Sequence, residues 1–301
     1  LVSKAEILLT KYIIRGDCAM ILYKYMSWPL DGENHARELI ESDEIYLSRP
    51  TEFNDPYDIG IIPVIEGKRS EVVNKLVEEI LNGHKKDPET FKDFLEPLIR
   101  RKIESYSSNE LDDICNDFIE NRQKTTAVLC FTDSPFNMLM WSHYADSHKG
   151  ICLEFNTDKN DAVPNIFEKL YRVEYTKNYP KINFVTEEKS EFYRKVYATK
   201  YHDWRYEHEY RAIYSCAEIP NGDGETEIQV IDSMIGAATN VSKKKMKKCE
   251  ISPQTITSVI CGCKMPQEQI DNLKEIVAKH KSQITIKKAS PIPNDFGIDI
   301  I

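Results

Sequence analysis

The sequence predicts an α+β protein built on a mixed, mostly antiparallel sheet with a helical insertion. Apolar runs of strand length follow one another closely, as they do in hairpins, and this mixed order argues against a doubly wound parallel sheet. Residues 66–124 differ from the rest, because they are highly charged and carry apolar residues at helical spacing. We expect a single elaborated domain over residues 1–301, with residues 66–124 as a helical insertion or lid.

The first part of the chain alternates helices and strands. A short amphipathic helix is expected over residues 1–20, and the apolar run at 21–25 predicts a strand. A Pro-Leu-Asp-Gly turn leads to a helix over 33–41. A second strand at 44–48 is ended by Arg49-Pro50.

Three helices are expected within residues 66–124, and strands are expected again from residue 125. The predicted strands are 127–131, 150–155, 170–175 and 209–214, and the predicted helices are 137–145 and 186–201. The chain then predicts strand 256–261, helix 267–279 and strand 284–287, which together make a basic β-α-β part within residues 243–301.

Composition excludes several classes of protein. The chain has 301 residues and a formal net charge of -9, and it holds no apolar run near the roughly 18 residues that a membrane-spanning helix needs. Charges interrupt the apolar residues at its start, so no secretory signal is expected there. The eight Cys lie mostly in apolar surroundings, as in Val-Leu-Cys-Phe. They predict reduced thiols and a cytoplasmic protein.

Positive charge is concentrated near the C-terminal end. Residues 243–301 carry eleven basic and six acidic side chains, whereas the chain as a whole is acidic. The run consists of Lys243, Lys244, Lys245, Lys247 and Lys248. It is either a solvated surface or a contact for nucleic-acid phosphates or an acidic partner.

Four segments combine polar and aromatic residues in a way that suggests a site. They are residues 53–58, 140–145, 148–155 and 204–211. Residues 53–58 form either a tight turn or a loop that aims Asn54, Asp55 and Tyr57 at a ligand.

Two spacings within these segments carry the argument further. Trp141 and Tyr144 are three apart on a helix and share a face. Glu207 and Glu209 share a face if the chain is extended, where repulsion raises one pKa, as happens at functional sites. The alternative is an exposed strand face on which Arg211 neutralises the pair.

Four short segments, in their order along the chain, resemble an uncharacterised bacterial family of unknown function over about residues 20–215. They are Leu-Tyr-Lys-Tyr, Phe-Asn-Asp-Pro-Tyr-Asp, Met-Trp-Ser-His-Tyr-Ala with His-Lys-Gly-Ile-Cys-Leu-Glu-Phe, and Trp-Arg-Tyr-Glu-His-Glu-Tyr-Arg. A weaker resemblance supplies chemistry. The chain resembles ADP-ribosyltransferases in the order of three features. These are Lys24 on the first strand, Ser48 on the next strand, and Glu207-x-Glu209 leading into a later strand.

That second resemblance implies the ADP-ribosyltransferase fold, a role for each residue, and NAD as substrate without a metal. Glu209 would bond the ribose 2′-hydroxyl and Glu207 would activate the acceptor. The other implied NAD-binding residues are Lys24, Tyr25, Ser48, Asn54, Asp55 and Tyr57, with Trp141 and Tyr144 stacking on adenine or on an acceptor base. The acceptor would be a nucleic acid or a protein, and the basic run slightly favours RNA or DNA. The setting would be a toxin or phage-defence effector with an antitoxin partner.

Two other functions stay open. His143, His148, His202 and His208, with Asp203 and the two glutamates, could serve a metal-dependent hydrolase or nuclease, although no tight ligand spacing exists. A non-enzymatic module would bind a nucleotide or a partner without turnover.

Overall fold

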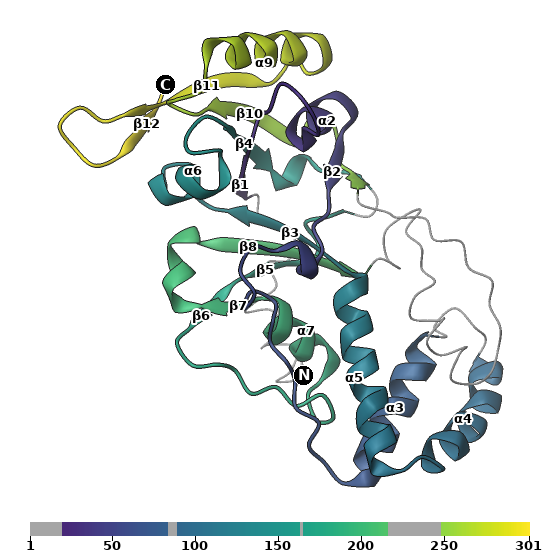
Figure 1. Ribbon diagram of the computed structural model, residues 1–301. Coiled ribbons are helices and arrows are strands. Elements are labelled where there is room, and N and C mark those ends of the chain that lie inside the picture. Colours follow the sequence, from purple (N-terminus) through teal and green to yellow (C-terminus); the bar gives the residue numbers. More distant parts are fainter. Residues whose placement is uncertain (1–19, 84–88, 163–164, 216–247) are drawn as a thin grey trace, which may run out of the picture.

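The computed structural model describes residues 20–83, 89–162, 165–215 and 248–301. The helix expected over residues 1–20 and Lys243 to Lys247 therefore lie outside the described residues. An eight-stranded sheet organises the described chain, in the order β12-β11-β10-β4-β1-β3-β8-β5 (Figure 1). Its strands are β1 (Ile21–Met26), β3 (Thr126–Thr132), β4 (Ile151–Asn156), β5 (Leu170–Arg172), β8 (Glu209–Ser215), β10 (Ile256–Cys261), β11 (Thr285–Pro291) and β12 (Ile298–Ile300).

Every neighbouring pair of this sheet is antiparallel except β10 and β11. The predicted α+β class with a mixed, mostly antiparallel sheet is therefore confirmed. The parallel pair is joined by α9 (Gln267–His280), as parallel strands require a crossover. Two short pairs lie outside the large sheet: β2 (Glu44–Tyr46) with β9 (Lys248–Glu250), and β6 (Glu174–Thr176) with β7 (Thr199–Tyr201).

The sheet opens between β1 and β3. These strands share one residue pair, Tyr23 with Thr132, whereas β1 and β4 share six and β3 and β8 share seven. Near the start of β3, Val128 exchanges two backbone hydrogen bonds with Ser48, at 2.8 and 3.2 Å. The segment after β2 therefore pairs with the part of β3 that β1 does not reach. As a result, a wedge-shaped space separates β1 from β3.

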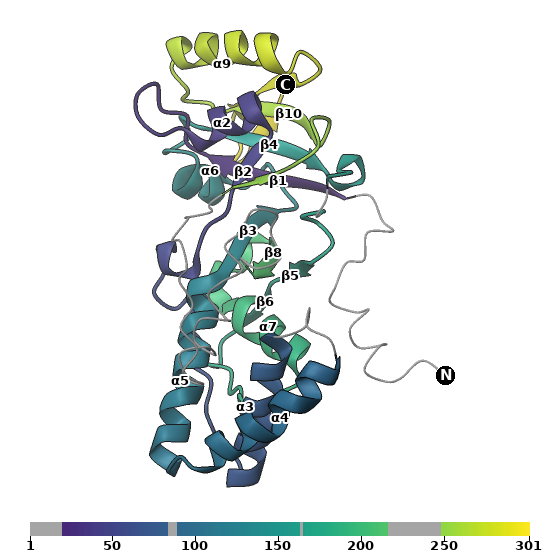
Figure 2. The ribbon, with the colours of Figure 1, turned by 90° about the vertical axis from the view of Figure 1, so that its right-hand side faces the viewer.

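Alternate residues of β3 pack on opposite faces of the sheet. Leu129 and Phe131 join the core under α2 (His35–Ser42) and α9, whereas Val128 joins the core formed with α3 (Arg69–Gly83), α4 (Glu89–Glu104) and α5 (Ser108–Thr125). The three predicted helices are therefore present. They project at the end of the molecule opposite α9 (Figure 2). A capping box formed by Ser107 and Glu110 begins α5.

Two predicted elements are wrong in extent. The strand expected at 170–175 divides into β5 and β6, because the chain passes from the large sheet to a small one at buried Val173. The helix expected over 186–201 ends early: α7 covers Lys189–Tyr197, and the chain then pairs with β6 as β7. Strand pairing here overrides the helical periodicity.

The described cysteines form no disulfide, and Cys115, Cys152, Cys249 and Cys261 are buried thiols. Every helix of the described residues is too short or too polar to cross a membrane.

Candidate functional site

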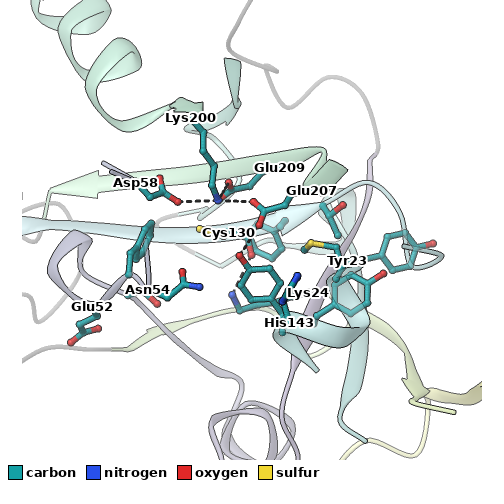
Figure 3. Close-up of a pocket in the computed structure, with 17 residues that line it drawn as sticks. Tyr23, Lys24, Glu52, Asn54, Asp58, Cys130, His143, Lys200, Glu207 and Glu209 are labelled. Carbon is teal, nitrogen blue, oxygen red and sulfur yellow. Dashed lines mark hydrogen bonds and ion pairs between the residues drawn. The ribbon is translucent and has the colours of Figure 1, made fainter. Parts of the chain in front are cut away.

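A cavity of about 400 Å³ occupies the wedge between β1 and β3 (Figure 3). We call it the carboxylate cavity. β1, β3 and α6 (Met138–Tyr144) form parts of its wall, and Ser48 with the loop at residues 52–58 closes one side. No described residue of the helical segment 66–124 lines it. The side chains most relevant to chemistry are Lys24, Asp58, Tyr144, Lys200, Glu207 and Glu209.

A sharp change in backbone direction brings Glu207 and Glu209 to this cavity. Glu207 ends a 3-10 helix, η3 (His202–Glu207), and Glu209 begins β8. Between them, His208 adopts the left-handed conformation with φ 47 and ψ 48. The chain is therefore not extended here, and the condition for a shared strand face is not met. Both carboxylates still meet, because Lys200 Nζ donates to Glu207 at 2.6 Å and to Glu209 at 3.3 Å.

Two buried cations hold the acidic side chains in place. Lys200 Nζ also lies 2.9 Å from Asp58 Oδ2 (Figure 3). Arg211 is fully buried and grips Glu209 with two hydrogen bonds of 2.8 Å, from Nε and from Nη2. Its Nη2 reaches Asp58 at 2.9 Å and its Nη1 donates to the Tyr197 carbonyl at 2.9 Å. The alternative of an exposed strand face is therefore wrong, because Glu207 and Glu209 are buried, but Arg211 does neutralise Glu209 as that alternative expected.

The two glutamates have pKa values shifted in opposite directions. Burial would raise the pKa of Glu209, but Arg211 and Lys200 outweigh it and lower that pKa to about 2. Burial and the neighbouring charge of Glu209 raise the pKa of Glu207. Carboxylate pairs with separated pKa values are common at sites of acid–base chemistry, and buried ion-pair networks produce them as well. Tyr144 contributes a hydrogen bond of 2.6 Å from its hydroxyl to Glu207 Oε1.

On the opposite side of the cavity, the charged side chain of Lys24 makes fewer polar contacts. Lys24 Nζ donates to the Cys130 carbonyl at 3.2 Å and lies 5.9 Å from the centre of the Phe131 ring. No carboxylate oxygen of the described residues lies within 4.0 Å of it. Burial lowers the pKa of Lys24. His143 stands exposed at the end of α6, with its ring centre 6.4 Å from that of Tyr144.

The cavity gathers most of the residues singled out from the sequence. Its lining includes Lys24, Tyr25, Ser48, Asn54, Tyr144, Glu207 and Glu209. Asp55 and Tyr57 instead line a neighbouring cavity. Lys248 on β9 is the member of the lysine run that the structure describes, and its Nζ lies 3.1 Å from Oε2 of Glu38 on α2. It does not line the carboxylate cavity.

Trp141 is a correction. It shares a helix face with Tyr144 as predicted, but it is completely buried and cannot stack on a ligand. Its Nε1 donates to the Pro135 carbonyl at 2.8 Å, and its ring packs edge-on against Tyr25 with centroids 5.1 Å apart. From this helix, Met140, His143 and Tyr144 line the cavity.

Sequence reasoning missed Asp58 and Lys200, and it named Arg211 as a partner of the glutamates but placed it on an exposed face. Asp58 could have been suspected, because it follows the other polar residues of the same short loop. Lys200 gave no signal, since it lies in a stretch with helical periodicity. Its importance depends on the pairing of β7 with β6, which directs it toward Glu207 and Glu209.

The histidines considered for a metal site lie in separate surroundings. His202 pairs with Asp203 at 3.7 Å and His208 with Asp133 at 3.3 Å, while His143 stays at the cavity rim. Within the described part of the chain, no three or more His, Cys, Asp or Glu side chains are grouped as metal ligands.

Residues 140–212 match the model of a family described as a protein of unknown function, DUF2971. The predicted resemblance to a family of unknown function is therefore confirmed over this segment, which begins within α6 and ends in the middle of β8. The match carries no activity with it and does not bear on ADP-ribosyltransferases. No curated protein and no solved structure matches the chain.

Proposed function

We propose that the carboxylate cavity cleaves the bond between nicotinamide and ribose in NAD and transfers the ADP-ribosyl group to an acceptor. The observation that carries this proposal is the convergence of Lys24, Ser48, Glu207 and Glu209 on one cavity, from three separate segments of the chain. Its volume of about 400 Å³ is within the range of small-molecule sites. On this proposal the sheet is a variant of the ADP-ribosyltransferase fold.

The chemistry needs a negative charge at the sugar. The bond between C1′ and the ring nitrogen breaks with its electron pair leaving on nicotinamide, which departs neutral, and positive charge develops on the ribose. A fixed carboxylate in a site shielded from water stabilises that charge. The acceptor nucleophile then bonds to C1′ and gives up its proton to a base.

We assign the direct role to Glu207 rather than to Glu209. Both oxygens of Glu209 already accept hydrogen bonds from Arg211, and Lys200 adds a third. Glu207 accepts one hydrogen bond on each oxygen, so it keeps acceptor positions for the ribose or the acceptor nucleophile. Its raised pKa also makes it the stronger base.

Other residues would act around this centre. Lys24 faces the carboxylates across the cavity and would hold a ribose oxygen or a phosphate of NAD (Figure 3). Tyr144 would orient Glu207. A nucleic-acid acceptor and a toxin or phage-defence setting remain part of the proposal, as does an antitoxin that blocks the cavity.

The test is to incubate the purified protein with labelled NAD and with separate pools of protein, RNA and DNA. We expect nicotinamide release and transfer of label to one pool. Glu207→Gln should lower the rate about 100-fold or more, as removal of electrostatic stabilisation does, in a variant whose circular dichroism spectrum shows that it is still folded. Asp203→Asn is the matched control, because it lies in the same η3 helix with a side chain that is 73% exposed.

Two results would overturn the proposal. One is a folded wild-type protein that releases no nicotinamide, and the other is a Glu207→Gln variant that turns over at the wild-type rate. Binding of NAD without release would instead identify a non-enzymatic nucleotide-binding module.

A further inference from the structure

A second cavity, of about 350 Å³, adjoins the carboxylate cavity. The two share Lys200 as a lining residue. The loop that follows η1 (Pro50–Glu52) also contributes to both, since Asn54 and Asp58 line the first cavity while Asp55 and Tyr57 line the second. We call this second space the tyrosine cavity. A ligand bound there lies next to the ionic side chains of the proposed reaction centre.

Three exposed aromatic rings surround the tyrosine cavity. Tyr57 is 74% exposed, Tyr179 is 58% exposed and Tyr201 is 51% exposed. They come from separate parts of the chain, and buried Ile61 adds an apolar surface beside them. Single exposed apolar residues are normal, but several large ones around one concave surface indicate a binding site.

Hydrogen bonds order one of these rings, Tyr179, and the turn that carries another, Tyr57. The Tyr179 hydroxyl donates to the Gly60 carbonyl at 3.2 Å and accepts from the Ile62 backbone N–H at 2.9 Å. Asp55 Oδ1 accepts from the Tyr57 backbone N–H at 2.9 Å, which fixes the turn that carries Tyr57. A ring that is held in place before binding, as Tyr179 is, loses little conformational entropy when a flat ligand inserts.

Polar groups at the edge of the cavity complement the rings. The side-chain amide of Asn178 makes no hydrogen bond to the described residues, so it can bond the polar edge of a ring. Lys177 has no carboxylate oxygen within 4.0 Å in the described part of the chain, so its ammonium can contact a phosphate. Both residues line the cavity. Aromatic faces, an amide and a cation together suit a nucleotide, whose base is flat and polar at its edge.

We propose that the tyrosine cavity binds a nucleobase of a nucleotide substrate used in the carboxylate cavity, an inference that rests on the proposed function for the choice of ligand. The base has two sources: the adenine of NAD or a base of a nucleic-acid acceptor. Both use the same stacking chemistry. Tyr57 is the most exposed of the three rings and its side chain bonds nothing among the described residues, so its removal tests stacking without disturbing the fold.

The experiment is a calorimetric titration of the full chain with three ligands. AMP represents the adenine half of NAD, nicotinamide mononucleotide represents the other half, and a short single-stranded RNA represents an acceptor. Tyr57→Ala should weaken the binding of AMP or of RNA about tenfold or more, the effect expected for loss of a stacking ring, and leave nicotinamide mononucleotide binding unchanged. Weaker AMP binding identifies the adenine of NAD, and weaker RNA binding with unchanged AMP binding identifies the acceptor base.

Matched variants separate stacking from other effects. Tyr57→Phe keeps the ring and should bind as the wild type does. Phe296→Ala removes a 95% exposed ring from the loop between β11 and β12 and should also change nothing. Tyr201→Ala should repeat the effect of Tyr57→Ala.

The inference is overturned if neither AMP nor RNA binding depends on Tyr57 and Tyr201. Its failure is distinct from failure of the proposed function. A wild-type protein that releases no nicotinamide but loses AMP or RNA binding with Tyr57→Ala would keep the tyrosine cavity and reject the reaction. Nicotinamide release with tyrosine-independent binding would do the reverse.

Discussion

The two sides of the carboxylate cavity hold their charges in different ways. We call Asp58, Lys200, Glu207, Glu209 and Arg211 the ionic wall, and each of these side chains contacts at least two partners. On the facing wall, Lys24 hydrogen-bonds one backbone carbonyl. Every side chain of the ionic wall is paired within it, and Glu207 also keeps acceptor positions, whereas Lys24 opposite them hydrogen-bonds a single carbonyl.

This difference indicates how the work of the site is divided. A buried ionic network contributes little net stability compared with a well-packed apolar core, because desolvation offsets its attraction. It does fix the positions of its members, and fixed charges are what a reaction that develops charge requires. On the proposed function, Lys24, which donates to one carbonyl and keeps further donors, would hold a ribose oxygen or a phosphate of NAD from the facing side.

The largest expected effect comes from breaking the ionic wall at Arg211. Arg211→Met fills similar volume but leaves Asp58 and Glu209 with Lys200 as their remaining cation. We expect the free energy of unfolding in urea to fall by about 3–5 kcal/mol, as when one partner of a buried ion pair is removed. Arg172→Met, at an exposed position of β5, is the matched control and should change it by less than about 0.5 kcal/mol. A loss below 1 kcal/mol for Arg211→Met would show that the wall is not a network.

Acid should weaken the ionic wall in a defined pH range. Folding lowers the pKa of Glu209 from 4.5 to about 2, so its stabilising contribution is complete above pH 4.5 and is lost as the pH falls toward 2. Glu207 opposes this trend, because its raised pKa favours the fold below pH 4.5 and that contribution is lost as the pH rises through the folded value.

The measurement is the free energy of unfolding against pH for the wild type and for Glu209→Gln. The difference between them should be a few kcal/mol near pH 6 and shrink between pH 4.5 and 2, where Glu209 becomes neutral like Gln. Glu120→Gln, at an exposed carboxylate of α5, is the control. A difference that stays constant down to pH 2 would contradict the proposed charge state of Glu209.

Local patterns predicted most strands and helices, because periodicity reports which face of an element is buried. They failed where contacts between distant segments decide the outcome. β7 forms because residues 199–201 pair with β6, and the left-handed turn at His208 is imposed where η3 meets β8. Neither contact leaves a trace in the nearby sequence.

The same reasoning explains what was predicted of the site. Glu207 and Glu209 were found from their short spacing, and Lys24 and Ser48 from their order along the chain. Helical spacing correctly placed Trp141 and Tyr144 on one face, but it could not show that the sheet covers Trp141 and leaves Tyr144 at the cavity. Lys200 was missed because its role arises only when three acidic side chains from two distant segments meet around it.

The smallest expected effect on stability concerns Lys24, and it is the sharpest comparison with Arg211. Lys24→Met keeps the apolar stem and removes a buried ammonium whose pKa is lowered. Because the fold disfavours the protonated form, the free energy of unfolding should stay the same or rise by about 1 kcal/mol at neutral pH. That gain should vanish as the pH approaches 10.5, where the unfolded chain also releases the proton. Lys159→Met, at an exposed lysine, controls for loss of a surface charge.

If the Lys24 side of the cavity binds NAD, Lys24→Met should also raise the KM for NAD, whereas Arg211→Met should lower the stability of the fold. A destabilisation of more than 2 kcal/mol by Lys24→Met would mean that Lys24 stabilises the fold as the ionic wall does. The two sides of the cavity would then not differ in function.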